Sequence, residues 1–121
     1  MNVQLARKLT AILGFLGVLF GAFGAHALRA RLDAAGTTSS WQTGVLYHLL
    51  HAVALLAVTS RPSVSRLTFW SFFFGIVVFS GSLYLLALTT ARWLGAITPL
   101  GGLGMLLGWL SLLFSRRDDV P

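Results

Sequence analysis

Four long apolar runs, separated by short polar links, dominate the pattern of this chain. They cover residues 9–26, 41–59, 67–88 and 94–114, and none of them contains lysine, arginine, aspartate or glutamate. A bilayer core of roughly 30 Å is crossed by about 20 apolar residues in helical form. Backbone groups in hydrocarbon must be hydrogen-bonded internally, and the runs are too long for barrel strands and lack their alternation. The pattern therefore predicts four membrane-spanning helices.

The links between the runs predict how these helices are connected. Arg61 and Pro62 interrupt the chain before the third run, and only residues 89–93 separate the third run from the fourth. Links this short place consecutive helices antiparallel. We therefore expect an all-α fold, an integral membrane up-down four-helix bundle that forms a single membrane domain over residues 1–121.

The first link carries two further signals. Residues 28–35 alternate loosely between apolar and charged side chains, which predicts a short helix in the membrane interface. Ser39 and Ser40 precede the second run, and either is expected to cap the second long helix.

The first run also resembles a secretory signal peptide. Two basic residues, Arg7 and Lys8, precede it, and the Ala-His-Ala sequence at residues 25–27 matches the small-residue pattern of a cleavage site. The apolar stretch is longer than the core of a usual signal peptide, so we favour a retained first span.

The composition supports a membrane protein and excludes several kinds of chemistry. Hydrophobic residues make up 56% of the 121 residues and charged residues 10%, and the mean hydropathy is +0.82. The absence of cysteine excludes disulfides, thiolate metal sites and cysteine nucleophiles. The only acidic residues, Asp33, Asp118 and Asp119, lie outside the apolar runs. Paired-carboxylate catalysis and a carboxylate relay inside the membrane are therefore not expected.

The net charge of +6 indicates a lipid bilayer rather than a nucleic acid as the partner. Basic residues stand singly or in pairs between apolar runs and form no continuous patch. Four spans place six bases on one side and three on the other, and the positive-inside rule then predicts a multi-pass protein of the cell (inner) membrane with cytoplasmic N- and C-termini. The six are Arg7, Lys8, Arg61, Arg66, Arg116 and Arg117, and the three are Arg29, Arg31 and Arg92.

Small residues predict how the spans pack on one another, and tryptophans predict where the spans meet the membrane interface. Gly17 and Gly21 in the first run, and Gly104 and Gly108 in the fourth, match the small-xxx-small pattern of closely packed helices. We favour packing within the chain, with homo-oligomerisation as the alternative. Four tryptophans near the ends of the runs are expected to act as interface anchors: Trp41, Trp70, Trp93 and Trp109.

Polar side chains within the runs are the candidate binding residues. They are costly in a bilayer unless paired, so they are expected to face the bundle interior, and the helical rise places them at similar depth in its outer half. We favour a structural hydrogen-bond network, against a pocket or polar path for a lipid headgroup, quinone or small polar solute. The candidates are His26, Gln42, His48, His51, Ser80, Tyr84 and Thr98.

Metal and catalytic sites are weaker interpretations of the same residues. The i,i+3 spacing of His48 and His51 suits two ligands of one metal, with His26 as a third, but no carboxylate is at hand to orient the imidazoles. Ser80 and Ser82 likewise lack an acid that would orient a histidine base. We therefore expect no metal, no cofactor and no catalytic residues.

Four blocks, taken together, resemble the YgdD/YwdK-like family of small four-span membrane proteins. They are Gly-Ala-Phe-Gly-Ala-His at residues 21–26, the segment from Trp-Gln-Thr to His-Leu-Leu-His-Ala-Val-Ala-Leu at 41–55, Ser-Gly-Ser-Leu-Tyr at 80–84, and Leu-Gly-Ala-Ile-Thr-Pro-Leu-Gly-Gly at 94–102. This family carries a domain-of-unknown-function label and has mitochondrial relatives. The resemblance implies four spans, a bacterial inner-membrane setting and no established activity.

The resemblance also implies which residues matter. In the family the position of His48 varies, which favours His51 with His26 and Tyr84 as the centre of the polar cluster. We expect a non-enzymatic protein that binds a lipid or membrane partner or assists the assembly of a membrane complex. The alternative is a small transporter or channel subunit that uses the polar cluster as its path. The signature positions map onto His26, Gln42, His51, Ser80, Tyr84, Thr98, Pro99 and Gly101.

Overall fold

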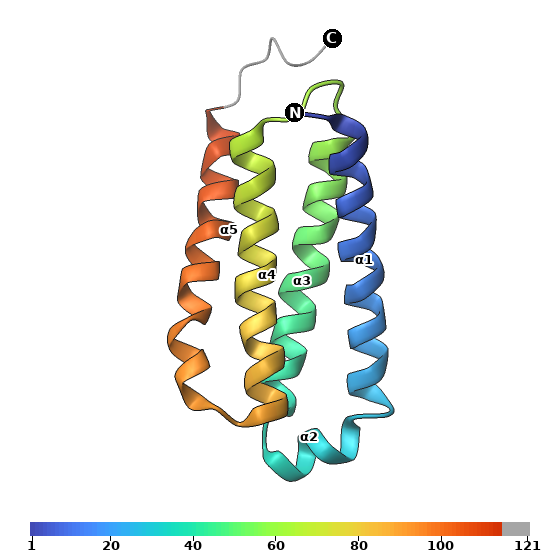
Figure 1. Ribbon diagram of the computed structural model, residues 1–121, viewed down its shortest axis with the longest axis vertical. Helices are drawn as coiled ribbons and strands as arrows, with labels where there is room; N and C mark the ends of the chain where they lie inside the picture. The colour runs from blue at the N-terminus through green and yellow to red at the C-terminus, as the bar shows by residue number, and fades with distance from the viewer. Residues whose placement is uncertain (115–121) are drawn as a thin grey trace.

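A computed structural model describes residues 1–114 of the chain, and all the regular secondary structure of this part is helical (Figure 1). Four long helices follow the four apolar runs, and two short ones lie in the links. The elements are α1 (Val3–Ala25), α2 (Arg29–Ala35), α3 (Thr38–Thr59), α4 (Arg66–Thr89), the 3-10 helix η1 (Arg92–Ala96) and α5 (Thr98–Leu113). The predicted all-α fold is confirmed.

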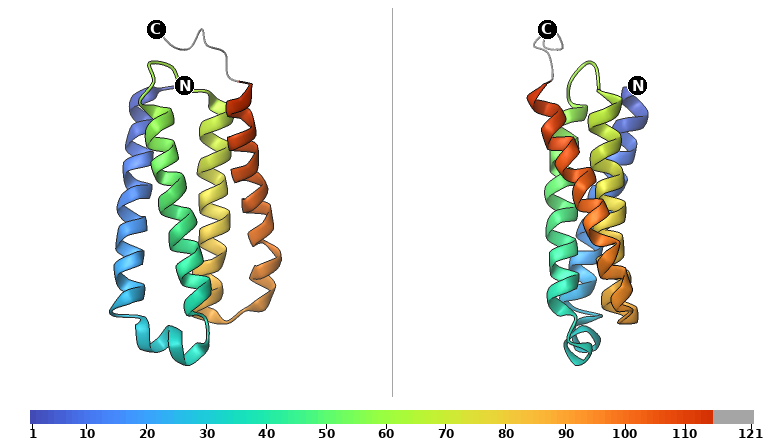
Figure 2. Two further views of the ribbon diagram at one scale, coloured as in Figure 1. Left: turned by 180° about the vertical axis from the view of Figure 1, so that it is seen from behind. Right: turned by 90° about the vertical axis from the view of Figure 1, so that its left-hand side faces the viewer.

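The long helices stand in a row in the order α1, α3, α4, α5. Each helix packs on its neighbour in the chain, and consecutive helices run antiparallel, as the short links predict (Figure 2). The start of α1 and the end of α5 lie at the same end of the long axis of the bundle, and α2 lies at the opposite end. The close packing of backbones thus gives α3 and α4 two long neighbours each and α1 and α5 one, although single side chains of α1 and α5 also reach α4 and α3.

Four segments of the described chain are long and apolar enough to cross a membrane, the fourth being η1 and α5 together. Large apolar side chains on all of them remain exposed, for example Phe15 at 69% and Val53 and Leu106 at 65%. In a bilayer such side chains contact lipid tails, so their exposure is expected of spans rather than of a soluble bundle.

The helix ends extend beyond the apolar runs because polar groups hold them. Asn2 caps α1 by accepting hydrogen bonds from the backbone N–H groups of Gln4 and Leu5. One turn later, the Arg7 Nε donates to the Thr59 carbonyl at 2.8 Å and ties the first turns of α1 to the last turn of α3.

The first link contains the expected short helix, which confirms the prediction for residues 28–35. Gly36 ends α2 in the left-handed conformation, with φ of 70°, which glycine adopts without strain. The predicted cap by Ser39 or Ser40 is wrong, because α3 already begins at Thr38. Thr37 precedes it and instead donates its hydroxyl to the Ala87 carbonyl of α4 at 2.8 Å.

The four glycines singled out in the sequence each face a neighbouring helix of the same chain. A Cβ at Gly17 would lie 2.6 Å from the Leu49 side chain of α3, and one at Gly108 would lie 2.7 Å from Phe72 of α4. The corresponding distances are 3.2 Å at both Gly21 and Gly104. These positions therefore let α1 approach α3 and let α5 approach α4.

Candidate functional site

His48 joins three helices. Its Nε2 lies 2.7 Å from the Leu13 carbonyl of α1, and its Nδ1 lies 2.8 Å from the Tyr84 hydroxyl of α4. A carbonyl oxygen only accepts, so the Nε2–H donates to Leu13 and Nδ1 accepts from the tyrosine. Both side chains are buried, with 4% of His48 and 9% of Tyr84 exposed. One neutral imidazole thus holds α1, α3 and α4 together.

Aromatic rings and a serine close off this part of the bundle. Phe20 and Trp41 pack on the Tyr84 ring, with centroids 5.0 Å and 4.7 Å away. The Trp41 Nε1–H donates to the Phe20 carbonyl at 2.9 Å, and the Ser80 hydroxyl donates to the Gly44 carbonyl at 2.7 Å. Every buried side-chain nitrogen and oxygen of the described chain has a partner. The polar core, defined as His48, Ser80 and Tyr84, is therefore sealed and satisfied.

His51 lies one turn further along α3 and faces α4 and α5 instead. Its Nδ1 is 2.8 Å from the Tyr47 carbonyl, and its Nε2 is 3.0 Å from the Trp109 Nε1–H. The Nδ1–H therefore donates to the carbonyl and Nε2 accepts from the indole, which is the tautomer opposite to that of His48. The Phe72 ring covers the imidazole with centroids 5.7 Å apart.

The other predicted site residues lie elsewhere. His26 is exposed at the C-terminal cap of α1, and Gln42 is exposed in the second turn of α3. Thr98 starts α5 and shares a hydrogen bond of 2.6 Å with Ser82 of α4. Pro99 occupies one of the first positions of α5, as expected.

The expected centre of His26, His51 and Tyr84 is wrong. Tyr84 bonds to His48 rather than to His51, and His26 lies outside the polar core. The i,i+3 histidine pair does not share a site either, because its two rings bond to different helices. Among residues 1–114 no three histidine, aspartate or glutamate side chains gather as metal ligands would.

Two interactions were missed because tryptophans were interpreted as interface anchors. Trp41 is 4% exposed and bonds within the bundle, and Trp109, about one turn before the end of α5, donates to His51. An indole N–H in an apolar helix needs an acceptor, and this need was the available signal. The hydrogen bond of 2.7 Å between Thr68 and Ser111, which joins α4 to α5, was also unforeseen.

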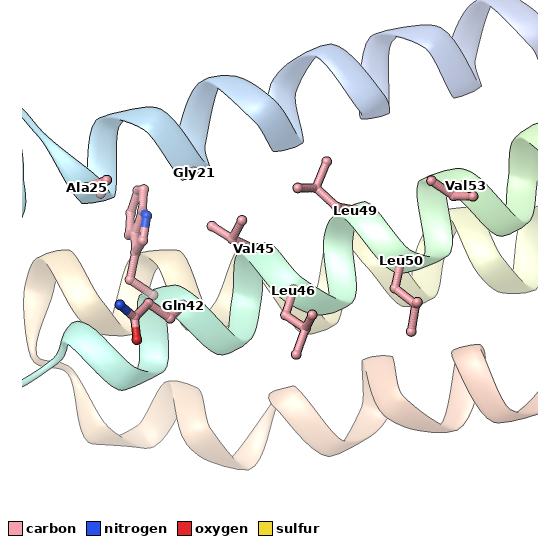
Figure 3. A pocket seen from close by; sticks show the side chains of 10 residues that line it. Gly21, Ala25, Gln42, Val45, Leu46, Leu49, Leu50 and Val53 are labelled. Carbon is pink, nitrogen blue, oxygen red and sulfur yellow. The ribbon is translucent and has the colours of Figure 1, made fainter.

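A groove runs between α1 and α3. It has a volume of about 510 Å³ and is lined mainly by small and aliphatic residues. In Figure 3, Val45 and Leu49 reach from α3 toward α1 across it. We call it the α1/α3 groove, with the lining residues Gly21, Ala25, Gln42, Val45, Leu49 and Val53 among others.

A polar pocket of about 250 Å³ adjoins this groove at the α2 end of the bundle. The two share Gly24, Ala25 and Gln42, so they are continuous. Asp33 in this pocket accepts a hydrogen bond of 2.5 Å from the Thr38 hydroxyl. We call it the interfacial pocket, lined by Gly24, Ala25, Arg29, Asp33, Thr38 and Gln42.

A larger cavity, of about 720 Å³, lies between α3 and α5, and α4 contributes Phe79 to its lining. Its polar lining consists of Tyr47, His51 and Trp109, and the remainder is apolar. His51 itself is 3% exposed, so it lies at the floor of the cavity rather than projecting into it. We call this the α3/α5 cavity; Phe79, Gly102 and Leu103 also line it.

The chain is similar to a group of bacterial membrane proteins. Residues 20–102 match the family described as "Protein of unknown function (DUF423)". The UPF0382 membrane protein YwdK of Bacillus subtilis is 41% identical over 111 residues, which cover 87% of this chain and 89% of that protein. The UPF0382 inner membrane protein YgdD of Escherichia coli is 43% identical over 109 residues, 85% of this chain and 82% of that protein.

The membrane character of the chain is thus supported by its four candidate spans and by the names of its relatives. No solved structure matches it. The matched region covers most of the bundle, from the second half of α1 into α5. The chain belongs to the DUF423 family, whose relatives named above are UPF0382 membrane proteins.

Proposed function

We propose that the protein binds a membrane phospholipid and performs no chemistry on it. The observation that carries this proposal is the continuity between the apolar α1/α3 groove and the charged interfacial pocket. A phospholipid has the same order of parts, an acyl chain followed by a charged headgroup at the bilayer surface. The groove therefore matches the acyl chain in polarity, and the interfacial pocket matches the headgroup in both polarity and position at the end of the spans.

The interfacial pocket supplies charges that fit a zwitterionic headgroup. Arg29 forms no ion pair or side-chain hydrogen bond within residues 1–114, so its guanidinium is available for a lipid phosphate. Asp33 lies one helical turn after Arg29 in α2, and one of its carboxylate oxygens accepts a hydrogen bond from the Thr38 hydroxyl. The second oxygen has no hydrogen-bond partner within residues 1–114, so it can accept a hydrogen bond from a primary ammonium. The acyl chain would then follow Val45 and Leu49 toward the bilayer centre.

A polar path through the bundle is not favoured, which weakens the transporter alternative. His48, Ser80 and Tyr84 are buried and bonded to one another or to backbone carbonyls. Conduction would require these bonds to be exchanged for bonds to a solute, whereas the α1/α3 groove and the α3/α5 cavity lie between helices and are lined mainly by apolar residues. The polar core is better explained as the structure that holds the grooves in shape.

Lipid retention tests this proposal. The full-length protein would be purified in mild detergent from phosphatidylethanolamine-rich membranes and analysed by native mass spectrometry. We expect one retained phospholipid per chain and about tenfold weaker retention in Arg29→Gln, because a charge-assisted hydrogen bond is worth about 1.5–3 kcal/mol. Arg92→Gln, which removes an exposed base at the same end of the bundle, is the matched control and should behave as wild type.

Equal retention in the two arginine variants, or no retained lipid in any sample, would refute the site. A dimer that carries no lipid would instead favour a second copy of the chain as the occupant, and a stable complex with another membrane protein would favour a role in assembly. In both alternatives the partner would bind to the exposed apolar side chains of α1 or α5.

The orientation proposed from the base count places α2 and the interfacial pocket on the outer side of the inner membrane, with both termini in the cytoplasm. Arg7, Arg61 and Arg66 lie at the opposite end of the bundle, near the start of α1. Arg116 and Arg117, also in the count, lie outside the described residues. A reporter enzyme that works only in the periplasm should be inactive when fused to the C-terminus, and activity there would reverse the assignment.

A further inference from the structure

Tyr47 places a hydroxyl group without a protein partner inside the second apolar run, in the outer half of the expected span. It lies nine residues after Thr38, about 14 Å along a helix of about 33 Å at the usual rise. Its side chain is 39% exposed, and its hydroxyl has no hydrogen-bond partner among residues 1–114. A donor in hydrocarbon is unfavourable without an acceptor, so a molecule from the bilayer is expected to supply one.

The neighbouring polar groups of the α3/α5 cavity cannot supply that acceptor. His51 uses its Nδ1–H on the Tyr47 carbonyl and its Nε2 on the Trp109 indole. The indole has only one donor, which is thereby engaged. The Tyr47 hydroxyl is therefore the one polar side-chain group of the described cavity lining that remains unpaired.

The walls of the cavity favour a flat ring. The Tyr47 and His51 rings are stacked, with an interplanar angle of 9° and centroids 6.0 Å apart. The ring centroids of Phe79 and Tyr47 are 4.7 Å apart, and Trp109 borders the cavity from α5. The volume of about 720 Å³ falls in the range of roughly 300–1,000 Å³ that is usual for small-ligand sites. Electron-rich aromatic walls suit an electron-poor ring of this size.

We propose that the α3/α5 cavity binds the ring of a membrane-soluble quinone, with a ring carbonyl accepting the hydrogen bond from the Tyr47 hydroxyl. The ring lies between Phe79 and Trp109, and the apolar tail leaves between α3 and α5 past Leu103. A quinone meets each requirement of the cavity because it is planar, carries carbonyl acceptors and dissolves in the bilayer interior. Leu50 is the one lining residue that the cavity shares with the α1/α3 groove, and the polar lining of the cavity, Tyr47, His51 and Trp109, takes no part in that groove.

Equilibrium binding of a short-tailed prenyl naphthoquinone tests the proposal. The full-length chain would be held in nanodiscs of phosphatidylcholine, with empty nanodiscs measuring simple partition. We expect saturable binding of one quinone per chain, about five- to tenfold weaker in Tyr47→Phe, as the loss of one hydrogen bond implies. The prenyl naphthalene that lacks both carbonyl oxygens is the matched ligand, and its binding should be the same in wild type and Tyr47→Phe.

A second pair of variants tests the cavity itself. Gly102 borders it, and a Cβ there would meet only ordinary contact with Phe79 at 3.8 Å, so Gly102→Leu fills the cavity without distorting the helix. It should abolish saturable binding of both ligands, whereas Gly81→Leu, at an open position on α4, should not. Partition without saturation, or unchanged quinone affinity in Tyr47→Phe, would overturn the proposal. If Arg29→Gln still loses phospholipid in that case, only the quinone site fails.

Discussion

His48 and His51 stand one turn apart on α3, yet they serve different parts of the molecule. His48 lies in the polar core, where α1 and α4 supply both of its hydrogen bonds. His51 bonds to its own helix and to α5, at the floor of the α3/α5 cavity. The difference follows from the row of helices, because α3 meets neighbours on more than one side and three residues rotate a side chain by about 60°.

This comparison separates structural polarity from polarity available to a ligand. Around His48 each donor is matched with an acceptor inside the protein, and the side chains are sealed by Phe20 and Trp41. Around His51 the same residue type leaves one neighbour, Tyr47, with an unpaired hydroxyl. Sealed positions should therefore be sensitive to substitution, and positions at the cavity should be tolerant.

The largest expected contrast lies between two adjacent glycines of α5. A Cβ at Gly101 would overlap the backbone nitrogen of Phe79, whereas one at Gly102 would be 3.8 Å from the Phe79 ring. Because α4 and α5 cannot both keep their positions, Gly101→Ala should lower the free energy of unfolding by about 3 kcal/mol. Gly102→Ala should change it by less than about 0.5 kcal/mol. Chemical unfolding in detergent measures both, and similar losses would contradict the contrast.

The two histidines provide the next contrast. His48→Ala removes two interhelical hydrogen bonds and should cost about 2–4 kcal/mol, at about 1–2 kcal/mol per bond in a membrane. His51→Ala removes one interhelical bond, from Trp109, and should cost about 1–2 kcal/mol. The same unfolding assay compares them. A larger loss at His51 than at His48 would mean that the cavity floor, not the polar core, holds the bundle.

The two tyrosines give the smallest and sharpest contrast. Tyr84→Phe deletes the donor to His48 and should cost about 1 kcal/mol, since a buried ring nitrogen loses its partner. Tyr47→Phe deletes a hydroxyl without a protein partner and should leave stability in ligand-free detergent unchanged. Thermal midpoints of the paired variants decide the matter, and equal shifts would show that the hydroxyls are in equivalent surroundings.

The sequence predicts the helices of this protein better than their contacts. Length and hydropathy suffice for the four spans, and charge alternation suffices for α2, because both signals are local. The assignment of His51 and Tyr84 to one cluster failed because it requires the rotation of each helix about its axis. His48 and His51 differ by about 60° around the axis of α3, and periodicity alone does not assign them to different helix interfaces.

The candidate site was predictable only in part. His48, Ser80 and Tyr84 were correctly identified as side chains that turn inward, since unpaired polar groups are costly in lipid. The importance of Trp109 and of Arg29 is not predictable in this way, because a tryptophan near the end of an apolar run is typical of an interface anchor and Arg29 enters the sequence argument only as a positive charge. Their roles depend on partners in α3 and on a pocket formed by three separate helices.

The most direct test of the sealed polar core is the nitrogen-15 NMR spectrum of the histidine rings in lipid bilayers. In a His26→Gln chain, two neutral rings of opposite tautomer should appear, with the proton of His48 on Nε2 and that of His51 on Nδ1. Weakening the Tyr84 bond by Tyr84→Phe should shift only the His48 signals. Two rings of the same tautomer, or a cationic ring at either position at neutral pH, would contradict the hydrogen-bond arrangement on which the account rests.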